Sequence, residues 1–174
     1  PHLLTAAGPY PENLGEGKLA GAQENHIYYY MGVALSALGD EEGAAKAFRK
    51  AAQGLSEPAG MMYYNDQPPE MIYYQGLALR ALGEEEAARS RFHKLIAYGQ
   101  AHLDDEVRID YFAVSLPDLL IFDDALGRRN QVHCHFMMAL GYQGQGEAAE
   151  AAKHFDAVRA LAPNHLGAQT MQEK

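Results

Sequence analysis

Cysteine is almost absent from this sequence, and tryptophan is missing altogether. The single cysteine, Cys134, cannot form an intrachain disulfide, so an apolar core has to hold the fold together. A chain without disulfides is compatible with a reducing compartment, and we expect a cytoplasmic location. No apolar run approaches the roughly 18 to 20 residues that span a bilayer, and no signal peptide is visible, so we expect no membrane partner.

Basic residues are also scarce. The 174 residues include 14 lysines and arginines against 23 aspartates and glutamates, which gives a net charge of −9. Proteins that bind nucleic acid need clustered positive charge, so this balance argues against a nucleic-acid partner. The nearest thing to a basic patch is the pair Arg128 and Arg129. Apolar residues make up 48% of the chain, which is an ordinary value for a globular domain.

Motifs that carry enzymatic chemistry are absent as well. The sequence contains neither a phosphate-binding glycine loop nor a G-x-S-x-G motif, and we expect no catalytic residues and no cofactor. The run His133-Cys134-His135 invites a metal interpretation, but side chains two apart on a helix do not face one ligand. We therefore expect no metal site, and a protein that is not an enzyme.

What the sequence does contain is an internal repeat. Residues 26–39 and residues 70–83 align without a gap at an offset of 44, and the residues that follow keep this offset. A third, looser copy is displaced from the second by 63 residues. The five recurring positions are, copy by copy, Gly32, Leu35, Gly39, Ala44 and Phe48; then Gly76, Leu79, Gly83, Ala88 and Phe92; then Ala139, Tyr142, Gly146, Ala151 and Phe155.

These residues resemble the tetratricopeptide repeat, whose pattern has a small residue at position 8, a large one at 11, glycine near 15, alanine at 20 and an aromatic at 24. Pro163 adds a proline at position 32 of the third copy. The sequence departs from the family at position 4, which holds no tryptophan, and in offsets longer than about 34 residues. The resemblance implies an all-α fold, a right-handed superhelical stack of antiparallel helix pairs with a long insertion outside the repeats.

The repeats divide the chain as follows. We expect a single domain over residues 1–174, with repeats at about 25–58, 69–102 and 132–165 and an insertion at about 103–130. Helices are predicted over residues 23–38, 41–54, 69–82, 85–102, 131–143 and 147–161, with a last one from residue 165. Residues 1–22 and 55–68 are predicted to be loops. The chain opens at Pro1 rather than at a methionine, so we expect a fragment of a larger protein.

Partner binding in the resembled family takes place in a concave groove lined by positions 2, 5, 9 and 12 of the first helix of each pair. These positions supply the candidate binding residues His26, Tyr29, Tyr73, Arg80, His133 and Phe136. Arg80 is the only basic residue of this lining, which argues against a receptor for acidic tails. An aromatic groove suits an apolar helix, a sugar face or another segment of the same protein, and the rings can equally be covered by the chain itself.

Two further segments are candidate binding regions. Tyr64, Asn65 and Asp66 combine a ring face with hydrogen-bonding groups, as a sugar site does, although Asn-Asp ahead of two prolines is also ordinary turn chemistry. Residues 109–122 are strongly apolar, and we expect them to pack against the repeats, with Asp110 at an edge where a ligand would meet it. Contact with another domain or subunit is the alternative for this segment.

A narrower resemblance bears on function. Residues 63–71, 110–118 and 123–130 are similar to the C-terminal repeat tail of a family of large bacterial proteins. The N-terminal part of those proteins is a domain of unknown function related to carbohydrate-handling β-sandwich domains. Two functions are therefore open: a scaffolding module that docks a neighbouring domain or a partner protein, and a carbohydrate-binding or glycan-processing accessory region.

The alignment makes Phe48, Phe92 and Phe155 equivalent buried rings. Because each ring would fill the space between paired helices, its truncation to alanine is expected to lower the free energy of unfolding by roughly 3–5 kcal/mol. Urea denaturation of the three variants checks this expectation. A ring that is open to solvent at any of the three positions would break the repeat assignment there.

Overall fold

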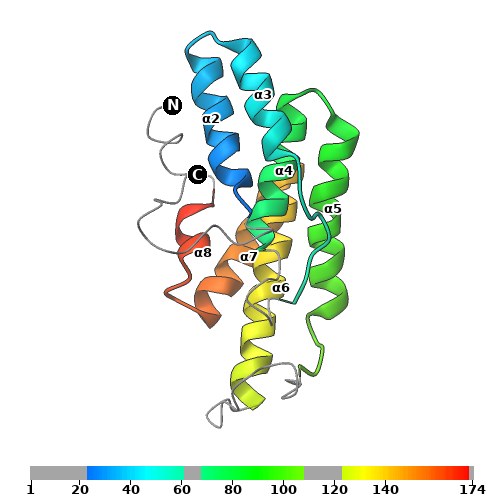
Figure 1. The fold of residues 1–174 in the computed structure, drawn as a ribbon. Coiled ribbons are helices and arrows are strands. Elements are labelled where there is room, and N and C mark those ends of the chain that lie inside the picture. The colour runs from blue at the N-terminus through cyan, green and yellow to red at the C-terminus, as the bar shows by residue number, and fades with distance from the viewer. Residues whose placement is uncertain (1–22, 61–67, 108–122, 173–174) are drawn as a thin grey trace, which may run out of the picture.

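The computed structural model describes residues 23–60, 68–107 and 123–172, and all regular structure in these residues is helical. The helices form consecutive antiparallel pairs that stack on one another (Figure 1), so the predicted all-α stack of helix pairs is confirmed. The helices are α2 (Asn25–Ala37), α3 (Glu41–Ala51), α4 (Pro69–Ala81), α5 (Glu85–His102), α6 (Asp123–Gln145), α7 (Ala148–Leu161) and α8 (Leu166–Thr170). None of the helices described combines the length and apolarity needed to cross a membrane.

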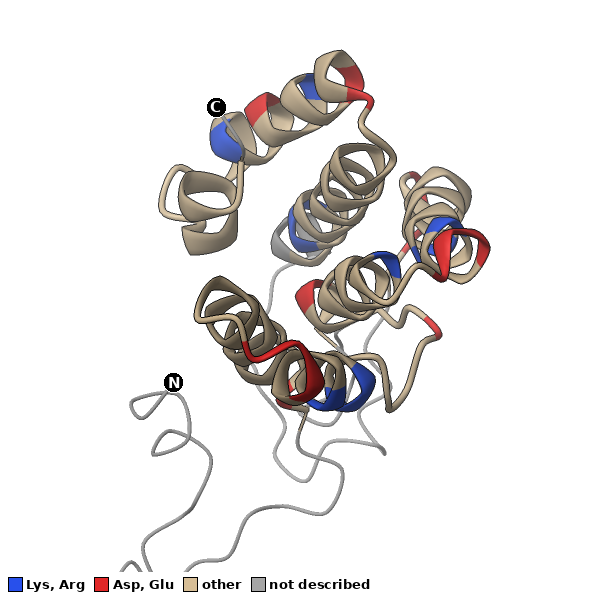
Figure 2. Cartoon of the chain, turned by 90° about the horizontal axis from the view of Figure 1, so that it is seen from above, with Lys and Arg blue, Asp and Glu red and all other residues tan. Residues whose placement is uncertain are grey.

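The turn inside each pair is the same in all three repeats. Gly39, Gly83 and Gly146 have φ values of 81°, 80° and 82°, the left-handed region that only glycine enters cheaply. The residue after each glycine donates its N–H five residues back, as Asp40 does to the carbonyl of Leu35 at 3.0 Å, so the end of the first helix is capped in the Schellman manner. Acidic residues follow these turns and lie at the start of the second helix of each pair, as Figure 2 shows from above. Carboxylates at this position stabilise the helix through its dipole.

The two helices of a pair meet where a glycine faces a phenylalanine. A Cβ added at Gly32 would lie 2.5 Å from the ring of Phe48, and one added at Gly76 would lie 2.4 Å from the ring of Phe92. The missing side chain therefore lets each ring pack directly against the backbone of its partner helix. Phe48 is 8% exposed, and Phe92 and Phe155 are fully buried, so the predicted burial of all three rings is confirmed.

Phe92 also joins the second pair to the third. A Cβ at Gly144 on α6 would lie 2.2 Å from its ring, and a Cβ at Gly141 would lie 2.5 Å from Ile96 on α5. The ring thus lies between a glycine of α4 and a glycine of α6. One apolar cluster extends from this contact through the second and third pairs, and a smaller cluster around Phe48 holds the first pair.

The predicted start of the first helix of the third pair is wrong. α6 begins at Asp123 rather than at 131, so the last eight residues assigned to the insertion are helical. Contacts with distant elements hold this extra length: Leu126 is buried, Arg128 donates to the carbonyl oxygen of Leu161 at 2.7 Å, and Asn130 donates to that of His102 at 2.7 Å. The expected packing of residues 109–122 lies outside the described residues.

Two glycines of α6 provide a matched test of the interhelical contact. Gly144→Ala is expected to lower the free energy of unfolding by about 1–3 kcal/mol, because the added methyl group would overlap the ring of Phe92. Gly127→Ala is the control, since a Cβ there meets nothing within 4 Å, and better helix propensity should raise stability by roughly 0.5–1 kcal/mol. Thermal denaturation of both variants decides the matter. Equal melting temperatures would show that Gly144 is not a close contact.

Candidate functional site

The side chains at the predicted groove positions are more exposed at the α2 end of the stack, which we call the open end, than at the α6 end, which we call the closed end. Position 9 shows this most clearly, because Val33 on α2 is 43% exposed, Leu77 on α4 is partly buried, and Leu140 on α6 is fully buried. Position 5 follows the same trend: Tyr29 is half-buried, whereas Tyr73 and Phe136 belong to the core. The first repeat therefore exposes side chains whose equivalents in the third repeat are buried.

The C-terminal helix α8 accounts for the closed end. The ring of His165 lies 4.5 Å from that of Phe136, and a Cβ at Gly167 would be 2.4 Å from the same phenylalanine. Gln143 donates to the hydroxyl of Tyr73 and to the carbonyl oxygen of Met171, both at 2.8 Å. The start of α8 thus lies against α6, where the first helix of a further repeat would be expected.

The open end carries a cluster of aromatic side chains from α2 and α4. Tyr30 is 49% exposed, and its hydroxyl lies 3.2 Å from that of Tyr74. The ring of Tyr74 lies 5.6 Å from those of Tyr29 and Tyr30 and 6.0 Å from that of His26, and burial raises the pKa of its phenol. His26 also approaches the sulfur of Met71 at 3.4 Å. We name His26, Tyr29, Tyr30 and Tyr74 the tyrosine cluster.

Sequence reasoning found half of this cluster. His26 and Tyr29 are predicted groove residues, whereas Tyr30 and Tyr74 occupy position 6, which the family pattern does not assign to the groove. The run of three tyrosines at 28–30 was the available signal, since three adjacent rings on a helix cannot all face the core.

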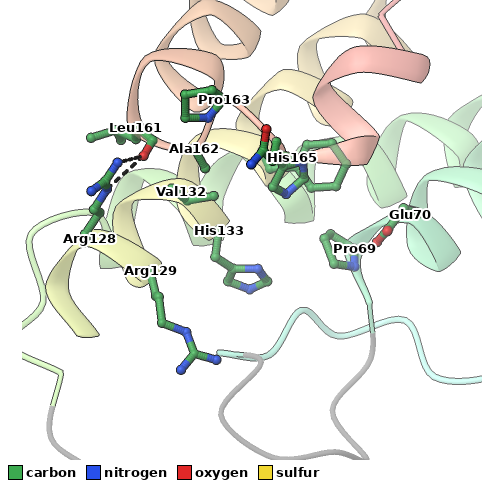
Figure 3. Close-up of a pocket in the computed structure, with 12 residues that line it drawn as sticks. Pro69, Glu70, Arg128, Arg129, Val132, His133, Leu161, Ala162, Pro163 and His165 are labelled. Atoms are coloured by element: carbon green, nitrogen blue, oxygen red, sulfur yellow. Dashed lines mark hydrogen bonds between the residues drawn. The ribbon is translucent and has the colours of Figure 1, made fainter. Parts of the chain in front are cut away.

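A second feature is a cavity of about 500 Å³ at the starts of α4 and α6. Figure 3 shows Arg128 and Arg129 on one side, Pro69 and Glu70 on the other, and His133 between them. The turn between α7 and α8 supplies the remaining wall. The full lining is Pro69, Glu70, Arg128, Arg129, Val132, His133, Phe136, Leu161, Ala162, Pro163, Asn164 and His165.

Burial and hydrogen bonds affect the protonation and the hydrogen-bonding roles of several side chains that line the cavity. Burial raises the pKa of the Glu70 carboxyl and lowers that of the His165 imidazole. His133 lies 2.6 Å from the carbonyl oxygen of Ala59, to which its Nε2 can only donate. The cavity therefore brings together His133 and Phe136 from the predicted lining with two arginines that the prediction left outside it.

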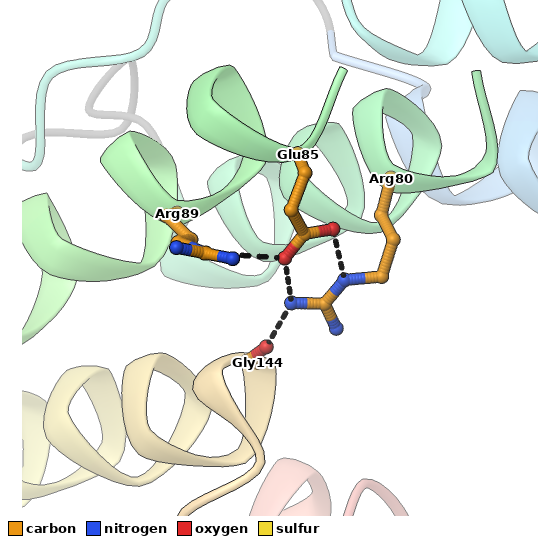
Figure 4. Close-up of polar contacts among 4 residues, drawn as sticks. All are labelled: Arg80, Glu85, Arg89 and Gly144. Carbon is orange, nitrogen blue, oxygen red and sulfur yellow. Dashed lines mark hydrogen bonds and ion pairs between the residues drawn. The ribbon is translucent and has the colours of Figure 1, made fainter. Parts of the chain in front are cut away.

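Arg80, another predicted groove residue, is held by other groups. Figure 4 shows its guanidinium against the carboxylate of Glu85 and the carbonyl oxygen of Gly144, at 3.2 and 2.6 Å. Its Cζ lies 5.0 Å from the centre of the Phe92 ring. Arg80 and Arg89 both pair with Glu85 and hold the pKa of that carboxyl below its usual range. These contacts tie the end of α6 to α4 and α5.

The run His133-Cys134-His135 points in three directions. His133 contacts the loop after α3, Cys134 is fully buried with its thiol pKa raised to about 11, and His135 lies 2.9 Å from His154 on α7. In the segments that the structure describes, no group of three potential metal ligands is present. The predicted binding residues Tyr64, Asn65, Asp66 and Asp110 lie outside those segments.

Comparison with known families agrees with this geometry. The structure is that of a helical-repeat protein. Its helix pairs are each joined by a glycine in the left-handed conformation, and in the first two pairs a glycine contacts a phenylalanine ring between the paired helices. The model of the tetratricopeptide repeat family matches residues 27–53 and 70–98, which contain the first two copies of the repeat. Repeats of this family generally mediate contacts between proteins and are typically not enzymatic. No solved structure matches the chain significantly.

The pair His135–His154 predicts a pH-dependent stability. Burial lowers the pKa of both imidazoles, and their Nδ1 atoms lie 2.9 Å apart, so the folded chain binds protons less readily than the unfolded chain. Stability is therefore expected to fall as the pH drops from about 7 to about 5, through the ordinary histidine pKa of about 6.5. His154→Gln, which cannot titrate, should reduce this fall in urea denaturation.

His93→Gln is the matched control for this prediction. Its side chain is exposed on α5, so the substitution should leave the pH dependence as in the wild type. A His154→Gln variant whose stability falls with pH as steeply as that of the control would contradict the assignment.

Proposed function

We propose that the chain is a protein-interaction module that docks an apolar segment of a neighbouring domain or partner protein on the open end of its groove. The contact surface comprises the tyrosine cluster and Val33. Tyrosine rings supply large contact areas with a polar hydroxyl at the edge, which suits a protein interface.

The observation that carries this proposal is the change in exposure along the groove. Val33 and Tyr30 are 43% and 49% exposed on α2, whereas the equivalent side chain on α6, Leu140, is fully covered. An apolar side chain at the closed end belongs to the core. At the open end the same repeat position presents apolar surface to solvent, and a partner that covers it gains the free energy of its burial.

The carbohydrate alternative stays a hypothesis. Its sequence basis is the group Tyr64, Asn65 and Asp66 and the narrower resemblance to a carbohydrate-linked repeat tail. Those three residues lie outside the described ones, and nothing among the described residues favours a sugar over a protein segment. A role in glycan processing would belong to a larger parent protein.

Site-specific photocrosslinking tests the proposed surface. A photoreactive benzoyl-phenylalanine at Val33 is expected to crosslink, in the source cells, to one segment of a partner or of the parent protein, because that side chain lies in the proposed interface. The same residue at Arg49, an exposed position on α3, is the control and should give no such product.

A second substitution separates the interface from mere proximity. Tyr30→Asp should reduce the Val33 crosslink several-fold, because it places a charge in an apolar contact, by an effect on the order of 1–3 kcal/mol. Crosslinks of equal yield at Val33 and Arg49, or a Val33 product that is indifferent to Tyr30→Asp, would rule out this face as the docking surface.

A further inference from the structure

The cavity between α4, α6 and the α7–α8 turn has the form of a small-ligand site. Its volume of about 500 Å³ lies within the range of roughly 300–1,000 Å³ that such sites occupy. Its walls are largely apolar, through Val132, Phe136, Leu161 and Pro163, with a few polar groups at the rim. An apolar wall with a small number of placed polar groups is the usual composition of a site that orients a small molecule.

The polar groups of the cavity are mainly donors. Arg128 uses Nε and Nη2 on the carbonyl of Leu161, which fixes the position of its guanidinium at the rim. Among the described residues, Arg129 has no hydrogen bond or ion pair. The Nδ1 of His165 accepts the N–H of Ala168 at 3.1 Å, so the neutral ring carries its proton on Nε2 and can donate one more hydrogen bond.

Among the described residues that line the cavity, Glu70 is the one that carries a carboxyl group. Glu70 lies across from the two arginines (Figure 3), and burial raises its pKa, so it opposes a nearby anion less than an exposed carboxylate would. The chain as a whole carries a net charge of −9, yet the described residues that line the cavity include two arginines and one acidic residue. The local balance therefore favours a negative group at the arginine side.

We propose that this cavity binds a small organic acid, in which a carboxylate is carried on an aliphatic or aromatic body. The carboxylate pairs with Arg129, which offers a planar fork of donors, and meets Arg128 at its side. The apolar body lies against Val132, Phe136 and Leu161. This site is separate from the tyrosine cluster and does not depend on the proposed protein-docking function.

Titration of the full chain with 3-phenylpropionate, followed by two-dimensional amide NMR, tests the proposal. The acid is expected to shift the amides of residues 128–136 and 162–166 in a saturable manner below about 10 mM, a concentration that reports even weak binding. The uncharged isostere 3-phenylpropanamide should bind at least about 10-fold more weakly, because it loses a charge-assisted hydrogen bond.

Substitutions then assign the charge. Arg129→Gln should weaken binding of the acid at least about 10-fold, and Arg129→Lys, which keeps the charge but not the fork, should lie between this variant and the wild type. Arg49→Gln makes the same change in net charge on the exposed face of α3 and should bind like the wild type.

Four outcomes overturn the proposal. The first three are no saturable shift with the acid, equal affinity for acid and amide, and equal losses of affinity for Arg129→Gln and Arg49→Gln. The fourth comes from a parallel titration with the capped peptide acetyl-Phe-Asp-Leu-amide, and it is binding of the peptide without binding of the acid. The last result would make the cavity part of a protein-docking surface. Arg129→Gln is expected to leave the Val33 crosslink unchanged, so failure of this site and failure of the proposed function are distinguishable.

Discussion

The ring of Phe92 is the contact on which the stack depends. Gly76 and Gly144 lack side chains where the ring lies, so α4 and α6 approach it from two sides, while the Cζ of Arg80 lies 5.0 Å from its centre. The same arginine donates to the carbonyl oxygen of Gly144, near the C-terminal end of α6, where the helix dipole favours a cation. The ring and the cation thus contribute, with the apolar cluster around them, to the contact between the second helix pair and the third. Because these contacts are between the helices themselves, the offset of 63 residues between the second and third copies need not disturb the stack.

The stacking of the helix pairs also explains why side chains at the predicted groove positions are exposed at one end only. An inner first helix such as α4 has a first helix packed on each side, whereas a terminal one has such a neighbour on one side only. α8 is only five residues long, yet its first turn lies against Phe136, and Met171 beyond it accepts a hydrogen bond from Gln143. The described residues show nothing comparable over Val33 and Tyr30 on α2, and both side chains are more than two-fifths exposed. A partner segment on that face would therefore extend the stack by the same kind of contact that holds it together.

Sequence reasoning could predict the helix pairs because each pair needs a left-handed turn between its helices and a close helix contact. Glycine marks both features in the sequence. The turn residues Gly39, Gly83 and Gly146 adopt φ values near +80°. Gly32 and Gly76 each contact a phenylalanine ring, so the spacing of glycine and phenylalanine predicts the helix pairs. The start of α6 was not predictable in this way. A repeat pattern says nothing about residues before its first position, and the extra turns are held by contacts of Leu126 and Asn130 with parts of the chain distant in sequence. The groove positions were predicted as equivalent, but exposure depends on what covers each helix, which no local pattern records.

The irregular third repeat is what creates the cavity. α6 has 23 residues against 13 in α2 and 13 in α4, and its additional length precedes the repeat's first position. Arg128 and Arg129 lie in that added length, beyond the start of α4, and only there can they face Glu70 across an open space. Arg128 is bound to the carbonyl of Leu161 at the end of α7, so the added turns and the α7–α8 turn hold each other in place. A regular repeat that began at about residue 132 would have neither arginine at this wall. The added turns at the start of α6 therefore give this stack a cavity wall that the helices of the first two repeats do not supply.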